Sequence, residues 1–467
     1  THVNMINLIS KFSQSNKINK LFNLLKYSTI LSLPSFLGIV FAIIAIPVHL
    51  QINGKSDYGN YIFFHFIISF GLLLNIGINK IVAVELAKRK FVVEIIKQSL
   101  KLSLNIIFII TIISVMSCFI FEKYYNIFTI GIGLSITVIY LTLDGILQGF
   151  KKFKLLSIVN FIFYTLSLNI PSICLILDNT LDFENLIIFS IFLKIFSIIT
   201  ILIYIKKFYK IEYNKNSKYN FITKFKKYSK WYSLHMLNLQ IFDFMDKYLI
   251  KIFIGPVALA IYSIPYQLAG KLTILSKSIS AVLLPEISYS NEKVNFNHSL
   301  NIFTFIIPLF ILIIFPFLDE VLVLWLKDQY SIEILYLTKI FLIVAWVSGI
   351  SHILITYFEA KKKIKFNTIL ELYFLFPFLL LLFYILFEFK NLILISFVLL
   401  LKECALIIFR TNKIKQRIDL LSLIYLNILI VVVNLIINIY YNEYFYYSFI
   451  SLVLFNSFLI IKKNLKK

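Results

Sequence analysis

The stretch IFDFMDKYLIK, Ile241–Lys251, decides how the sequence is divided between membrane and water. Four charged residues lie in this stretch, although the surrounding residues form an apolar run long enough to cross a membrane. Charge at membrane depth is costly, so it marks a transport site, a neutralised cluster or a segment that does not span. The remainder of the chain distinguishes these three interpretations.

The composition predicts a polytopic membrane protein. Hydrophobic residues make up 60% of the chain, charged residues 15%, and the mean hydropathy is +0.88. Soluble domains have about 45–50% apolar and about 25% charged residues. The net charge of +23 is explained by lysines in short inside loops, so we expect no nucleic-acid partner. A lysine-rich start before a long apolar run also predicts that no signal peptide is cleaved.

Cysteines, histidines and glycines indicate no cofactor or metal. Each of the three cysteines stands alone in an apolar run, and the six histidines form no ligand-spaced pair on one helix face. The sequence has no Gly-rich phosphate loop after a strand and no HExxH. We therefore expect a transporter without catalytic residues, cofactor or metal.

Apolar windows of roughly twenty residues predict an all-α protein with about fourteen transmembrane helices. The windows lie at 27–48, 58–79, 99–121, 126–149, 155–177, 184–205, 231–254, 257–285, 297–318, 334–358, 366–387, 391–409, 418–440 and 444–461.

The distribution of Lys and Arg supports this division. With the N-terminus inside, and with Lys101 and Lys251 near the ends of their windows counted in the adjacent loops, 35 of the 46 Lys and Arg residues fall in inside segments, 5 in outside loops and 6 within spans. This asymmetry follows the positive-inside rule. Removing the window that contains Ile241–Lys251 would invert every later loop. We therefore expect this stretch to span the membrane, with both termini in the cytoplasm.

Two pairs of segments indicate an internal repeat. Gly54 in QINGKSDYGNYIFF aligns with Gly255 in IFIGPVALAIYSIP, and a tyrosine follows each glycine at the same distance. The turn LQGFKKFK (147–154) likewise resembles FEAKKKIK (358–365). Both pairs fit six spans repeated in the same orientation, and such parallel repeats place the substrate site between two bundles.

The repeat divides the chain into four parts. We expect an N-terminal lobe of six spans at 1–205, a basic cytoplasmic linker at 206–230, a C-terminal lobe of six spans at 231–409, and two additional spans with a basic tail at 410–467. Within the linker, FITKFKKYSKWY fits either a basic amphipathic stretch on the membrane surface or a solvated loop.

The residues around these turns also carry a family resemblance. The first half contains DYGNY (57–61) and GLLLNIGINKIVAVELAKRK (71–90). The second half contains an Asp-led span, a turn with Gly and Tyr, and a closing Pro followed by Ser; these are Asp246, Gly255, Tyr262, Pro285 and Ser288. The chain resembles the polysaccharide and O-antigen flippases of the multidrug/oligosaccharidyl-lipid/polysaccharide exporter (MOP) superfamily.

The resemblance implies two six-helix lobes that open alternately. It implies a cargo of undecaprenyl-pyrophosphate-linked oligosaccharide that moves from the inner to the outer leaflet, and a polysaccharide polymerase as partner. Members of the family often carry an arginine before the first turn, whereas this chain has His49 there. Because Arg89, Arg410 and Arg417 lie in inside segments, we expect any cation that meets the pyrophosphate to be Lys or His.

Charged residues within the spans are the candidates for the cavity. The candidates for contact with the substrate are Lys247, Lys271, Lys277, Lys194, Asp243 and Asp246. The alternative for each lysine is snorkelling to an interface or pairing with an acid. Asp243 and Lys247 form an i, i+4 pair, and Asp246 shares their face, so we expect Lys247 to be partly neutralised. Lys339 and Lys402 are expected to be structural.

Asp144 and Gln148 lie one turn apart on the fourth span. An intramembrane carboxylate commonly carries a proton or Na⁺ in transporters, while the alternative is a helix–helix hydrogen bond. Glu359 and Glu371 lie near the inside ends of their spans, where structural roles are expected.

Two other functions stay open at this point. An ion-coupled multidrug exporter of the same superfamily would share the fold but carry a cationic cargo. A membrane polysaccharide polymerase or ligase would need a long outer loop with catalytic groups. The longest outer loop, 318–333, contains no His or Arg, which disfavours an enzyme.

Overall fold

The computed structural model describes residues 37–87, 91–120, 124–208, 221–290, 313–361 and 363–414, with single residues at 30, 33 and between 296 and 311. Every regular element in these ranges is a helix. Besides Leu37–Ile52, the elements are α2 (Gly54–Ser69), α3 (Gly71–Leu74), α4 (Ile78–Ala87), α5 (Val92–Ile120), α6 (Tyr124–Gly149), α7 (Phe153–Asn160), the π-helix η1 (Phe161–Leu166), α8 (Ser167–Cys174), α9 (Phe183–Phe208), α10 (Phe221–Phe253), α11 (Pro256–Ser290), η2 (Phe315–Phe317), α13 (Leu318–Leu326), η3 (Lys327–Gln329), α14 (Ile332–Ala360), α15 (Ile364–Glu388) and α16 (Leu392–Ile414).

The helices follow the predicted windows closely. Eight described helices are long and apolar enough to cross a membrane. Each window from 27–48 to 391–409 overlaps helical residues, although 297–318 is only partly described. The windows 418–440 and 444–461 lie outside the described residues. The count of fourteen spans therefore stays a prediction.

Two segments differ from the expected pattern. The second window is interrupted between α3 and α4, where Ile76 and Gly77 have φ angles of +54° and +74°. The stretch FITKFKKYSKWY is not a loop, because α10 begins at Phe221 and runs through it without interruption. The linker of 206–230 therefore begins and ends within helices.

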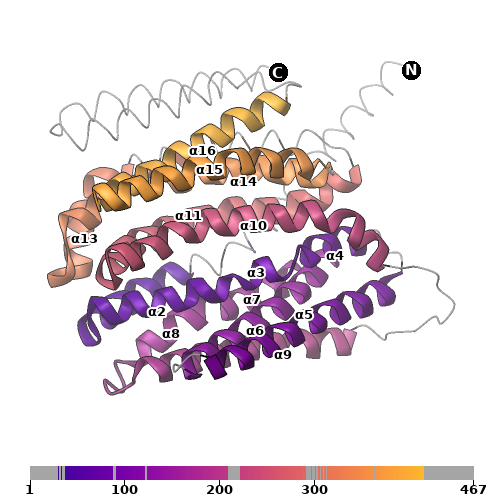
Figure 1. The fold of residues 1–467 in the computed structure, drawn as a ribbon, viewed down its shortest axis with the longest axis horizontal. Helices are drawn as coiled ribbons and strands as arrows, with labels where there is room; N and C mark the ends of the chain where they lie inside the picture. Colours follow the sequence, from indigo (N-terminus) through magenta and orange to yellow (C-terminus); the bar gives the residue numbers. More distant parts are fainter. Residues whose placement is uncertain are drawn as a thin grey trace, which may run out of the picture.

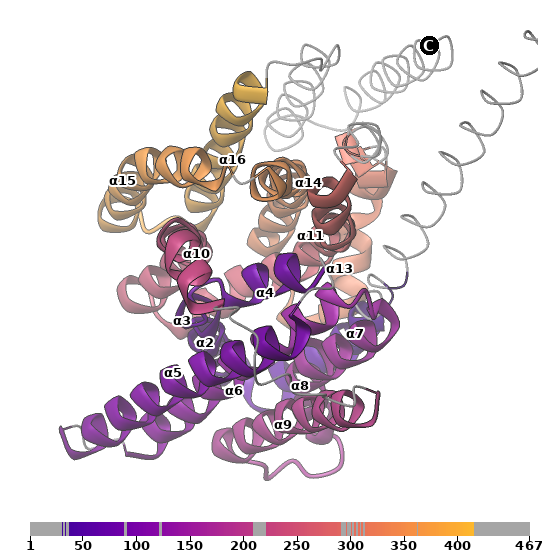
Figure 2. The ribbon, with the colours of Figure 1, turned by 90° about the vertical axis from the view of Figure 1, so that its right-hand side faces the viewer.

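Helices from the two parts of the sequence gather on two sides of the molecule. Figures 1 and 2 show α2–α9 packed together on one side, and α10, α11 and α13–α16 on the other. The predicted repeat turns lie at corresponding places. Gly54 begins α2 with φ +81°, and Gly255 directly precedes α11 with φ +120°. Glycine adopts such angles without the strain that a Cβ would cause.

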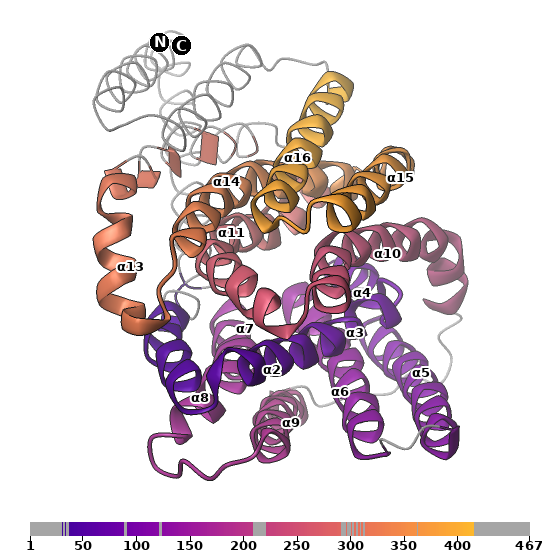
Figure 3. The ribbon, with the colours of Figure 1, turned by 60° about the vertical axis from the view of Figure 1, so that its left-hand side comes forward.

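The two sides touch at both ends of the helices. Near the starts of α2 and α11, which lie together in Figure 3, a Cβ at Gly59 would come 2.2 Å from the carbonyl oxygen of Pro256. At the opposite end, Lys80 of α4 lies 3.6 Å from Glu359 of α14. Only a residue without a side chain allows the first contact, so the glycine sets how closely α2 approaches α11.

Candidate functional site: a charged cavity among α10, α11 and α14–α16

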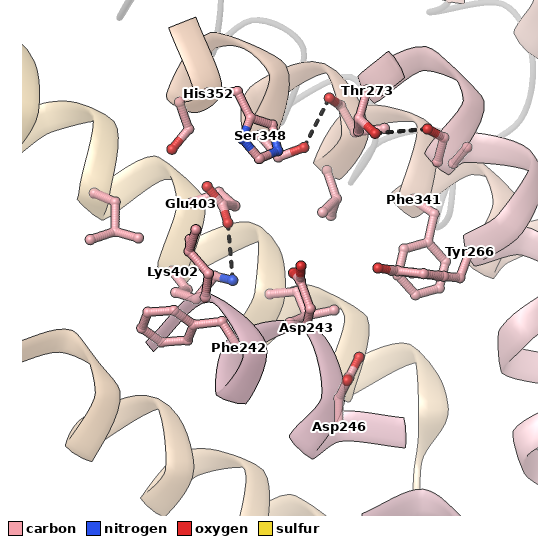
Figure 4. A pocket seen from close by; sticks show the side chains of 18 of the residues that line it. Phe242, Asp243, Asp246, Tyr266, Thr273, Phe341, Ser348, His352, Lys402 and Glu403 are labelled. Carbon is pink, nitrogen blue, oxygen red and sulfur yellow. Dashed lines mark hydrogen bonds and ion pairs between the residues drawn. The ribbon is translucent and has the colours of Figure 1, made fainter. Parts of the chain in front are cut away.

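A cavity opens among α10, α11, α14, α15 and α16 (Figure 4). It encloses about 900 Å³ of empty volume, including its opening to solvent. Four acids and four bases line it: Asp243, Asp246, Glu371, Glu403, Lys247, Lys277, Lys402 and Arg410. All lining residues come from the second half of the chain, so this cavity does not lie at the expected place between two bundles. Phe66 of α2 touches the outside of this wall, since its ring lies 5.2 Å from the Nζ of Lys247.

Lys247 is held in the wall of the cavity by its neighbours. Its side chain is 1% exposed, and its Nζ lies 3.1 Å from Oδ1 of Asp246 and 3.7 Å from the centre of the Tyr266 ring. Tyr262 donates a second hydrogen bond of 2.6 Å to Asp246. The expected i, i+4 contact with Asp243 exists only through the backbone, since Lys247 donates to the Asp243 carbonyl oxygen at 2.6 Å. Asp246 is therefore the acid that neutralises Lys247.

Two further ion pairs lie along α15 and α16. The Nζ of Lys402 is 3.0 Å from Oε1 of Glu403 (Figure 4). Arg410 is 1% exposed, and it donates at 2.7 Å to Oε1 of Glu371 and at 2.7 Å to Oδ1 of Asn367. The expectation that no arginine meets this space was wrong, because α16 extends to Ile414 and carries Arg410 into the cavity lining.

Asp243 and Lys277 are the two charged residues of the cavity that take no part in these three ion pairs. Both side chains are exposed. Within the described part of the chain, neither the Asp243 carboxylate nor the Lys277 ammonium hydrogen-bonds or ion-pairs with another side chain. Asp243 points into the middle of the cavity in Figure 4. The cavity thus presents one acid and one base to a ligand.

The other predicted candidates lie outside this cavity. Lys194 of α9 is 5% exposed and sits 5.3 Å from the centre of an aromatic ring. Lys271 of α11 points toward the first helix, since a Cβ at Gly38 would lie 3.4 Å from its Nζ. Asp144 is 7% exposed and accepts a hydrogen bond of 2.7 Å from Gln148, as their spacing predicted. That bond lies within one helix, not between two.

A second polar cluster connects the cavity to the first half. His235 lies 2.7 Å from Glu371 through Nδ1 and 4.0 Å from Glu359 through Nε2. Glu359 in turn lies 3.6 Å from Lys80 of α4. Because Glu371 also binds Arg410, the contacts run without a break from one side of the molecule to the cavity. Glu359 and Glu371 thus have the structural surroundings expected of them.

Sequence reasoning missed Arg410, His235 and His352, of which Arg410 and His352 line the cavity. One signal was available in the i, i+4 spacing of Asn367 and Glu371. The amide of Asn367 donates to Glu371 at 2.8 Å, which fixes the carboxylate that Arg410 binds. No signal of that kind marks the histidines, whose partners come from distant helices.

Solved structures define the class of protein. The lipid II flippase MurJ in an inward closed conformation matches with a TM-score of 0.64 and 16% identity, over 94% of this chain and 99% of that chain. An outward-facing multidrug resistance MATE family transporter of the MOP superfamily matches with 0.62 and 13%, over 83% and 95%. A MOP superfamily transporter from Pyrococcus furiosus matches with 0.61 and 13%, over 83% and 95%. This chain has the fold of these transporters and is a multi-pass membrane protein.

One relative is similar to this chain in sequence as well as in kind. The "Putative O-antigen transporter" of Shigella flexneri is 24% identical over 246 residues, which are 52% of this chain. The chain spans 58% of the length of that relative. No family model matches the sequence. The predicted resemblance is confirmed, and the similar proteins are transporters and flippases, not enzymes.

Proposed function

We propose that this chain is a flippase for an undecaprenyl-pyrophosphate-linked oligosaccharide, such as an O-antigen or capsule-type repeat unit. It would move this cargo from the inner to the outer leaflet of the bacterial cytoplasmic membrane. The sequence similarity to a protein named as an O-antigen transporter carries the proposal. A fold shared with a lipid II flippase over 94% of the chain supports it.

Alternating access gives the mechanism. Two six-span lobes, 1–205 and 231–409, would rock about the linker 206–230, with two further spans at 410–467 and both termini in the cytoplasm. The matching glycine turns before α2 and α11 support such a repeat. A polysaccharide polymerase would receive the cargo in the outer leaflet.

Lys277 is the cation that we assign to the pyrophosphate. It is the lysine of the cavity that keeps an exposed ammonium without an acid partner among the described residues. An ammonium binds phosphate oxygens as a compact charge with three donors. Lys247 and Asp246 hold the wall of the cavity together, because their charges are already neutralised by each other.

A deletion strain tests the proposal in the cell. Loss of the gene should stop surface polysaccharide and make lipid-linked repeat units accumulate in the inner leaflet. Unchanged polysaccharide, with no accumulated repeat units, would show that the chain has another cargo. Purified protein in vesicles should also make a labelled lipid-linked oligosaccharide accessible to a glycosidase added outside.

An ion-coupled multidrug exporter is the second candidate. It is favoured by the similarity to multidrug resistance transporters and by Asp243, whose carboxylate would attract a cationic cargo. In that case Asp144 is the proposed carrier of H⁺ or Na⁺. Uptake of a cationic dye by vesicles with an imposed ion gradient would separate the two functions. Asp144→Asn should abolish that uptake if the exporter model holds.

A further inference from the structure

The charges of the cavity cancel in pairs and leave two opposite charges apart. Lys247 pairs with Asp246 at an N–O distance of 3.1 Å, Lys402 with Glu403 at 3.0 Å, and Arg410 with Glu371 at 2.7 Å. Asp243 and Lys277 remain exposed, one on α10 and one on α11. A pyrophosphate alone would satisfy the lysine but would be repelled by the aspartate.

Two hydroxyl groups of the cavity, those of Thr273 and Ser348, offer acceptors to a ligand. Thr273 donates its hydroxyl proton to the carbonyl oxygen of Gly270 at 2.7 Å, and Ser348 donates to that of Ala345 at 3.0 Å. A hydroxyl has one proton and two lone pairs, so each can only accept from a ligand while this bond persists. Both side chains lie around the same open space as Asp243 in Figure 4. This wall therefore fits a ligand group that is positively charged and rich in N–H donors.

A protonated amine has this chemistry. Its three N–H donors match a carboxylate and neighbouring hydroxyl oxygens, whereas a neutral sugar hydroxyl supplies one donor and no charge. An N-acetyl group supplies one N–H and a carbonyl acceptor, which would face the acceptors of this wall. The same position thus distinguishes an amino sugar from its acetylated form.

We propose that the cargo is zwitterionic: a lipid-linked oligosaccharide whose sugar carries a free ammonium group. Asp243 binds the ammonium, and Lys277 binds the pyrophosphate. This inference rests on the proposed flippase function and adds the charge pattern of the cargo to it. With this cargo bound, each of the two exposed side chains faces a group of opposite charge.

Two matched probes test the inference with the full chain in nanodiscs. One is a polyprenyl-pyrophosphate disaccharide with a free 2-amino group, and the other is the same compound after N-acetylation. The free amine should bind about tenfold more tightly, as a charge-assisted hydrogen bond predicts. Asp243→Asn should remove this preference, because it weakens binding of the free amine while it relieves the repulsion of the pyrophosphate in the acetylated probe. Lys277→Gln should weaken both probes to the same extent.

Control variants separate a local effect from a folding defect. Asp243→Glu keeps the charge and should keep the preference for the amine. Glu388→Gln removes an exposed acid at the end of α15, outside the cavity lining, and should change nothing. Thermal unfolding of Asp243→Asn should match that of the wild type.

The outcomes distinguish this inference from the proposed function. Equal binding of both probes by the wild type, or a preference that persists in Asp243→Asn, overturns the zwitterionic cargo and leaves the flippase standing. If the wild type binds neither probe, both the zwitterionic cargo and the flippase function are wrong.

Discussion

The two halves of the molecule accommodate buried charge in different ways. In the first half, Asp144 is held by the neutral amide of Gln148, and Lys194 lies over an aromatic ring. In the second half, acids and bases meet each other around an open cavity, as in the pair Arg410 and Glu371. The halves have similar turns and helices but different side-chain chemistry. Similar helices therefore hold buried charge with different partners, a neutral amide or an aromatic ring in one half and an opposite charge in the other.

The largest expected effect comes from breaking a pair of the second half. Arg410→Ala leaves Glu371 buried and opposite His235 without its cation, which should lower the free energy of unfolding by about 3–5 kcal/mol. Thermal unfolding in detergent measures this loss. The control is Lys413→Ala on the same helix, whose exposed side chain should change stability by no more than about 0.5 kcal/mol.

In the first half, removing a buried charge should change the thermal stability only slightly. Lys194→Met removes a charge that stabilises no acid in the described structure, so the unfolding temperature should stay the same or rise. A loss as large as that of Arg410→Ala would contradict the difference between the halves.

The contact between the halves is tested at Gly59. A Cβ there would lie 2.2 Å from the Pro256 carbonyl oxygen, so Gly59→Ala should move α2 from α11 and cost about 1–3 kcal/mol of stability. Distances between spin labels on α2 and α11 measure the displacement. Gly270→Ala is the matched control, because no atom lies within 4 Å of its added Cβ. Equal spin-label distances in both variants would show that this contact does not set the spacing.

Substitutions of Lys277 and Lys247 should have smaller effects, on transport for the first and on stability for the second. Lys277→Gln should reduce transport of the lipid-linked cargo about tenfold without loss of stability, because it removes one charged contact to the cargo. Lys247→Gln should instead lower the unfolding temperature, since Asp246 loses its cation. Flipping in vesicles and thermal unfolding, both at matched protein amounts, measure the two quantities. A stable Lys247→Gln with lost transport would reverse the assignment.

The smallest effect is expected at the ion pair that joins the halves. Lys80 is 28% exposed, so its contact with Glu359 should contribute about 0–1 kcal/mol. Lys80→Ala should increase the population in which α4 and α14 separate, as judged by labelling of a cysteine introduced between them. Lys80→Arg keeps the charge and should behave as the wild type. No change in labelling would mean that the ion pair of Lys80 and Glu359 does not hold the halves together.

The helical windows could be predicted because they depend on neighbouring residues alone. Apolar length and the asymmetry of lysines place α6, α9, α14 and α15 within a few residues of their windows, while α5 and α10 begin seven and ten residues before theirs. The interruption at Ile76 and Gly77 was not predicted, because the run there remains apolar. Arg410 was assigned to a loop because hydropathy falls before the helix ends.

The sequence by itself determined that the chain crosses the membrane many times and that IFDFMDKYLIK carries its charges within a helix. Tertiary structure alone decided which charges meet. Lys247 binds the carboxylate of Asp246 because tyrosines of α11 surround that pair, while Asp243 turns to the cavity. Hydropathy is a property of neighbours along the chain, whereas an ion pair depends on helices that are distant in sequence. The pairing of charges, and so the two that remain for a ligand, follows from packing.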